Sequence, residues 1–168
     1  MRNKILVAAV IVVGLASVAY AAFAQTLTIT GITTASGNWD VQITGITRTG
    51  STGSATDAAT TPSFTGTTAT FNVDFAYPGS SATYDVTIEN LGNVTAKVST
   101  IPSVTTINAA EPVDVKYTIV SGPAVNDTLA PAASTTVTVK AEWLSAATTN
   151  PVSASKTATA LAYGYVQN

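Results

Sequence analysis

A nine-residue segment near the start of the chain, residues 25–33, reads QTLTITGIT and has the period-two pattern of a β-strand. Leu27 and Ile29 alternate with threonines, so one face of the strand is apolar and the other carries hydroxyl groups. The residues that follow contain Gly and Ser but no turn sequence that would return the chain as a hairpin. Such a strand has an unpaired backbone edge and needs a partner.

The core of this segment is repeated in the chain. The sequence ITGIT occurs at residues 29–33 and again at residues 43–47, inside the first strand predicted for the body of the protein. A free strand that resembles a strand of its own domain can be donated to a neighbouring copy, and repeated donation builds a fibre. Alternation alone is equally compatible with an ordinary first strand that pairs within its own domain.

The residues before this segment have the organisation of a secretory signal peptide. Arg2 and Lys4 are positive, an apolar run follows, and small residues precede the bond between Ala24 and Gln25. We therefore predict a cleaved signal peptide over residues 1–24 and a secreted, extracellular protein that meets a membrane only during secretion. A retained membrane anchor and a type IV-like pilin helix are alternatives, because the apolar stretch is nearly long enough to span a bilayer.

Composition excludes several functions. Cleavage would leave 168 − 24 = 144 residues, enough for one domain with a hydrophobic core. Five basic and nine acidic residues would remain, a net charge of −4, with no basic patch for nucleic acid. The absence of Cys and His excludes disulfides, the usual zinc-protease ligands and a Ser-His-Asp triad. We therefore predict no enzyme activity, no metal site and no cofactor.

Thirty-one threonines, most of them beside apolar residues, favour β-strands with a hydroxyl-rich solvent face. No helical period is convincing. Seven or eight antiparallel strands in residues 35–168 predict an all-β single domain, either a two-sheet β-sandwich or a jelly roll. The strands are expected at residues 39–46, 69–75, 84–88, 94–98, 113–119, 135–143 and 155–166. The first of them is expected to contain a bulge at Gly45. The strands at 84–88 and 94–98 are expected to form a hairpin with a turn at residues 90–93.

Several short motifs in the body carry a family resemblance. They are the Pro78-Gly79 turn, the strand and turn YDVTIENLG (84–92), the strand VTAKV (94–98), an opening WDV (39–41), the LAP turn (129–131) and the closing strand. In this order they resemble the TasA/camelysin-like secreted proteins, which include bacterial biofilm-matrix fibre subunits and archaeal bundling pilins. The sequence departs from the family pattern at Ser80, where an acidic residue is usual, and at Ala132, where Gly is expected.

The resemblance implies a jelly-roll subunit that polymerises by donor-strand exchange, in which the N-terminal strand of one copy fills a groove in the next. Residues 25–34 are then the donor segment, with Gln25, Leu27, Ile29 and Ile32 as its interface. Burial of the three apolar side chains would contribute about 1.5 to 3 kcal/mol each. The partners would be other copies of this chain, in filaments that can also bundle laterally.

Two further features have functional interpretations. Sequons at Asn93 and Asn126 are candidate N-glycosylation sites near predicted turns, although a Thr-rich chain contains such triplets by chance and Asn93 also has a role in the turn.

A competing function is a monomeric cell-surface module for adhesion or carbohydrate binding, which would use exposed aromatic residues in a cleft. Trp39 and Trp143 are the candidates, but both alternate in phase with predicted core positions.

Overall fold

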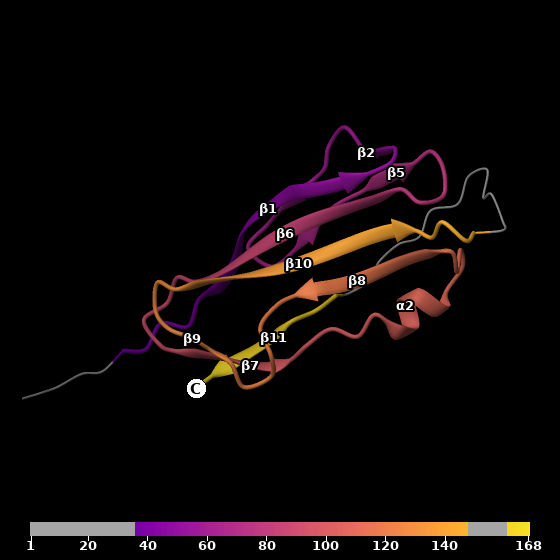
Figure 1. Cartoon of the computed structure of the whole chain (residues 1–168). Coiled ribbons are helices and arrows are strands. Elements are labelled where there is room, and N and C mark those ends of the chain that lie inside the picture. Colours follow the sequence, from indigo (N-terminus) through magenta and orange to yellow (C-terminus); the bar gives the residue numbers. More distant parts are fainter. Residues whose placement is uncertain (1–35, 148–160) are drawn as a thin grey trace, which may run out of the picture. The chain divides into compact units, whose positions relative to one another are not determined.

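The computed structural model describes residues 36–147 and 161–168, which form an all-β fold (Figure 1). The predicted signal peptide (1–24) and donor segment (25–34) lie outside the described residues, as do residues 148–160. The described ranges contain no helix that is long and apolar enough to cross a membrane. The elements are β1 (Val41–Thr52), β2 (Ala55–Asp57), β3 (Ser63–Phe64), β4 (Ala69–Thr70), β5 (Val73–Phe75), β6 (Ser81–Asn90), β7 (Ala96–Thr100), α2 (Thr105–Ala109), β8 (Val115–Ser121), β9 (Thr128–Leu129), β10 (Ser134–Trp143) and β11 (Gly164–Gln167).

A four-stranded antiparallel sheet has the order β1-β6-β10-β8. In its two central strands alternate residues are buried, among them Val86 and Ile88 of β6 and Val137 and Val139 of β10. Because side chains on a strand alternate between two faces, this pattern gives the sheet one apolar face and one face rich in threonine. The alternation that predicted strands at these residues is therefore confirmed.

A three-stranded antiparallel sheet has the order β11-β7-β9. Its residues Ala96 and Leu129 belong to the same buried cluster as Val86 and Ile88 of the four-stranded sheet. Apolar residues of the short pairs β2-β5 and β3-β4 also pack against this cluster. Within the described residues, both larger sheets thus contribute to one hydrophobic core.

The predicted hairpin between residues 84–88 and 94–98 is wrong. β6 pairs with β1 and β10, whereas β7 pairs with β11 and β9, so the chain leaves one sheet at Asn90 and enters the other. The Asn90 side chain is fully buried and donates hydrogen bonds to the carbonyl oxygens of Val94 and Leu129. A buried amide that satisfies backbone groups in this way fixes a crossing between sheets, and it does so with the same Asn-x-Gly sequence that is typical of a turn.

The first strand and the residues around it differ in part from the prediction. The bulge predicted at Gly45 is present as a register shift between β1 and β6. β1 continues to Thr52, beyond the strand expected at residues 39–46, and one short helix, α2, forms where none was expected. Trp39 precedes β1 and is 42% exposed, so the expectation that it faces the core is wrong. The period-two argument fails there because Trp39 is outside the paired strand.

Candidate interaction site

Strand β10 has neighbours on both sides for only part of its length. Its pairing with β6 begins at Ser134, but its pairing with β8 begins at Thr138, opposite Ser121. The sequence after Ser121 is Gly122-Pro123, which ends β8 at that point. On the β8 side, the first four residues of β10 therefore have no strand neighbour in the part of the chain that the structure describes.

The direction of the unpaired backbone groups follows from the hydrogen bonds at the two ends of β10. Trp143 N donates to the carbonyl oxygen of Ser80 (2.9 Å), and the Ala133 carbonyl oxygen accepts from Asn90 N (3.0 Å). The odd-numbered residues of β10 therefore direct their N–H and C=O groups toward β6. Since these groups alternate along an antiparallel strand, those of Ser134 and Thr136 point to the opposite, open side.

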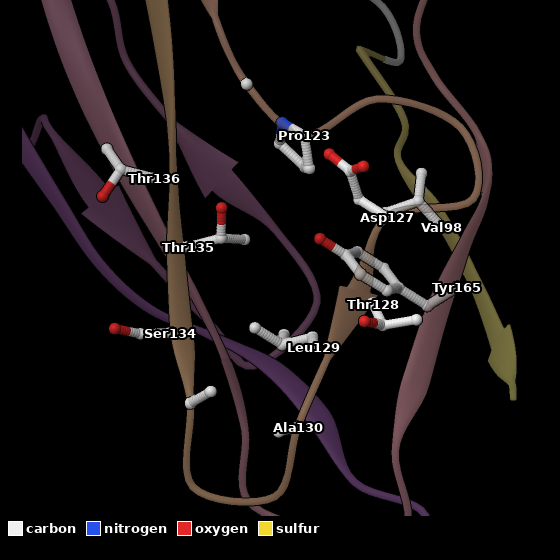
Figure 2. Close-up of a pocket in the computed structure, with 12 residues that line it drawn as sticks. Val98, Pro123, Asp127, Thr128, Leu129, Ala130, Ser134, Thr135, Thr136 and Tyr165 are labelled. Atoms are coloured by element: carbon white, nitrogen blue, oxygen red, sulfur yellow. The ribbon is translucent and has the colours of Figure 1, made fainter.

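A cavity of about 700 Å³ borders this open edge. Figure 2 shows β10 on one side of it and β9 with the Tyr165 ring on the other. Its walls thus come from both sheets and from the loop between β8 and β9. The residues around it are Val98, Gly122, Pro123, Asp127, Thr128, Leu129, Ala130, Ala133, Ser134, Thr135, Thr136 and Tyr165.

The cavity has a small apolar floor and many neutral polar groups. Val98 and Leu129 are buried, and Asp127 is the only charged residue among the described residues that line it. The Tyr165 hydroxyl is buried without a hydrogen-bond partner among the described residues. Burial raises the pKa of Tyr165, so the hydroxyl is neutral and can donate a hydrogen bond at physiological pH. An uncharged polar or backbone group that enters the cavity would satisfy it.

The outer edge of β8, by contrast, is covered in the structure. The Asn108 side chain donates from Nδ2 to the carbonyl oxygen of Tyr117 (2.8 Å) and accepts at Oδ1 from Tyr117 N (2.8 Å). One side-chain amide therefore replaces the two hydrogen bonds that a neighbouring strand would make there. On the other side of the sheet, Ile43 N of β1 donates to the carbonyl oxygen of Gly66 (2.8 Å). Such covers protect sheet edges against association.

The described residues contain no group of three or more His, Cys, Asp or Glu side chains that could hold a metal ion. A half-buried ion pair, Arg48 with Asp57 (3.4 Å), lies beside the buried Tyr84, whose hydroxyl donates a hydrogen bond to Asp57. These groups satisfy one another, so they connect β1, β2 and β6.

The candidate glycosylation sites differ in their surroundings. Asn93 Oδ1 accepts a hydrogen bond from Asn38 N (2.6 Å), and its Nδ2 donates to the carbonyl oxygen of Ser36 (3.2 Å). Asn126 is exposed, with a positive φ of 75°, at a loop position beside the cavity-lining Asp127. The structure therefore assigns Asn93 a role in holding the chain before β1, and it leaves the Asn126 side chain accessible.

The other predicted site residues are those of the cleavage site and the donor segment, together with the two tryptophans. Ala24, Gln25, Leu27, Ile29 and Ile32 lie outside the described residues. Trp143 is 4% exposed, whereas Trp39 is 42% exposed, so the two tryptophans do not share an exposed surface.

The gap beside β10 was not predicted from the sequence. The available signal was Gly122-Pro123, which ends β8, but its effect depends on the register between β8 and β10. That register is not visible in either strand alone.

Comparisons with protein-family models, curated proteins and solved structures return no match for this chain.

Proposed function

We propose that this protein is a structural subunit of an extracellular filament, a pilus or biofilm-matrix fibre, and that it polymerises by donor-strand exchange. The proposal rests on the open edge of β10. Residues 134–137 of this strand pair with β6 on one side, have no described strand neighbour on the other, and border a cavity. An unpaired edge inside a sheet is a site for β-strand addition. The predicted donor segment, residues 25–34, supplies a strand that needs a partner.

The proposed architecture is a two-sheet β-sandwich of jelly-roll type. It is supported by the core that residues of both sheets share and by the buried Asn90, which joins β6 to β9. A sandwich places the ends of two sheets side by side, so one strand can fill a gap between them. The family resemblance, the predicted signal peptide and the hydroxyl-rich composition are compatible with secretion and self-assembly.

The energetics of donation depend on the apolar face of the donor segment. Ladder hydrogen bonds would contribute about 0.5 to 1.5 kcal/mol each, and burial of Leu27, Ile29 and Ile32 about 1.5 to 3 kcal/mol each. Ordering the strand costs about 1 to 2 kcal/mol per residue, which offsets much of this gain. The apolar side chains therefore decide whether donation is favourable.

A second candidate function is a monomeric surface module for adhesion or carbohydrate binding. The observation that favours it is the exposed Trp39, because aromatic rings on protein surfaces often contact ligands. The buried Trp143 weakens it, since only one of the two tryptophans is accessible. In this alternative, residues 25–34 pair within their own domain.

Negative-stain electron microscopy of two proteins tests the proposal. One is the mature chain that begins at Gln25, and the other is a truncated chain that begins at Ala35. A matched control, Leu27→Ser with Ile29→Ser in the mature chain, keeps the length of the segment and removes its apolar face. Filaments from the mature chain alone support strand donation. Filaments from the truncated chain, or single particles from all three, contradict it, and single particles favour the surface module.

A further inference from the structure

We infer that the acceptor groove is the gap between β9 and the first half of β10, and that residues 25–32 of a neighbouring copy lie in it with their threonine face toward solvent. This inference rests on the proposed function and adds the site, the facing of the strand and the groups that receive it. Each of these follows from the geometry of the described residues.

The open edge of β10 has backbone groups that can form hydrogen bonds with an incoming strand. Ser134 and Thr136 direct two N–H and two C=O groups to the open side, by the alternation established from the bonds at Ala133 and Trp143. Across the cavity, β9 is an edge strand of the three-stranded sheet, and its one partner among the described strands is β7. A strand placed between β10 and β9 would therefore meet an unpaired edge on each side.

The facing of the inserted strand is determined by which side chains of β10 are buried. Val137 and Val139 face the core, so Thr135 lies on the same face, whereas Ser134 and Thr136 are exposed on the other. A strand added to this sheet must present its apolar residues on the core face. Leu27 and Ile29 then contact the floor of the cavity, and the threonines at positions 26, 28 and 30 continue the hydroxyl-rich outer face. A bulge at Gly31, like the one at Gly45 in the repeated ITGIT sequence, brings Ile32 to the same face as Ile29.

The polar groups of the cavity fit a backbone rather than a charged ligand. Residues 25–34 contain no charged side chain, and the walls contain one carboxylate, Asp127. The Tyr165 hydroxyl, which lacks a partner among the described residues, can donate to a backbone carbonyl of the incoming strand. Another candidate occupant from this chain, residues 148–160, contains Pro151, which has no N–H group to donate to a neighbouring strand.

Engineered disulfides test the site, because the chain has no Cys of its own. One preparation of the mature chain carries Thr28→Cys or, to cover a shifted register, Thr30→Cys. The other carries Thr136→Cys, at an exposed position next to the groove. The two preparations are mixed before assembly and oxidised in the filament, and mass spectrometry identifies the disulfide-linked peptides. The matched control is Thr118→Cys, an exposed position on the outer face of β8.

The inference predicts a mixed disulfide between copies with Thr136→Cys, at a yield at least tenfold above that with Thr118→Cys. Filaments that link through Thr118→Cys instead would overturn the groove assignment and leave strand donation intact. Filaments with no mixed product at either position would overturn the assignment as well. A failure of the unsubstituted mature chain to form filaments would overturn the proposed function itself, so the two failures are distinguishable.

Discussion

The Asn90 side chain donates a hydrogen bond from Nδ2 to the carbonyl oxygen of Leu129 at 2.9 Å, which ties the end of β6 to β9. The same amide donates to the Val94 carbonyl oxygen (2.8 Å) and accepts from Gly92 N (3.1 Å). Asn90 is fully buried, so no water replaces these bonds when the amide is removed. The residue therefore holds together the two sheets that border the proposed groove.

We predict that Asn90→Ala lowers the free energy of unfolding by about 3 kcal/mol, since buried backbone groups left without a partner cost about 1 to 3 kcal/mol each. Urea denaturation followed by tryptophan fluorescence measures the change. Asn38→Ala is the matched control, because Asn38 is exposed and has an ordinary negative φ, and its effect should stay within about 0.5 kcal/mol. Equal stability of the two variants would show that Asn90 does not join the sheets.

Stability should fall as pH rises above about 10, the ordinary pKa of tyrosine. Burial first, and then the hydrogen bond to Asp57, raise the pKa of Tyr84 in the folded protein. The unfolded chain therefore loses this proton at a lower pH than the folded chain, which favours unfolding as pH increases. Burial raises the pKa values of Tyr117, Tyr163 and Tyr165 in the same direction.

The urea midpoint measured from pH 8 to pH 11 tests this, with Tyr84→Phe beside the parent protein. The variant should start from lower stability at pH 8, because Asp57 loses a donor, and should then lose less as pH rises. Parallel curves for the two proteins would contradict the role of Tyr84 and assign the slope to the other tyrosines.

Ala132 has a positive φ of 59°, a conformation that glycine adopts more easily than alanine. We predict that Ala132→Gly raises the free energy of unfolding by about 1 kcal/mol, because the left-handed conformation costs an L-residue about 1 to 2 kcal/mol. Ala130→Gly is the control in the same turn, and it should be neutral or destabilising. A loss of stability in both variants would show that the turn is not strained at Ala132.

Proline substitutions separate the two edges of β10. Ser134→Pro removes an N–H that points to the groove and leaves the ladder with β6 intact, whereas Thr135→Pro removes an N–H that points to β6. We predict that Ser134→Pro folds normally and raises the critical concentration for filament elongation up to about tenfold. Thr135→Pro should instead destabilise the folded subunit by about 1 to 3 kcal/mol.

Sedimentation of filaments at a series of protein concentrations gives the critical concentration, and urea denaturation gives the stability of each variant. Unchanged assembly by a normally folded Ser134→Pro protein would argue that this edge receives no strand.

The sequence was sufficient for the all-β class and for most strand positions, because alternation is a local signal. Val137 and Val139 alternate with threonines in the sequence and are buried in the structure. The sequence was insufficient at Asn90, where a turn-like motif carries the chain into another sheet. Its role depends on contacts with Leu129, which is 39 residues away in the chain.

The gap beside β10 also depends on contacts between residues that are far apart in the sequence. β8 ends at Ser121, but the consequence of that ending depends on Ser121 lying opposite Thr138 and not opposite Ser134. Strand register is determined by packing across the sheet, so a single strand does not reveal which part of its neighbour stays unpaired. Trp39 illustrates the limit of alternation, since its phase fits the core but its backbone is not in a strand.

A cryo-electron microscopy reconstruction of the filament formed by the mature chain would show whether a donated strand fills the groove beside β10. We predict a strand of density between β9 and β10, paired with Ser134 and Thr136, that continues into residue Ser36 of the neighbouring subunit. Density that joins this strand to the same subunit, or a groove that is empty in the filament, would contradict strand donation at this site.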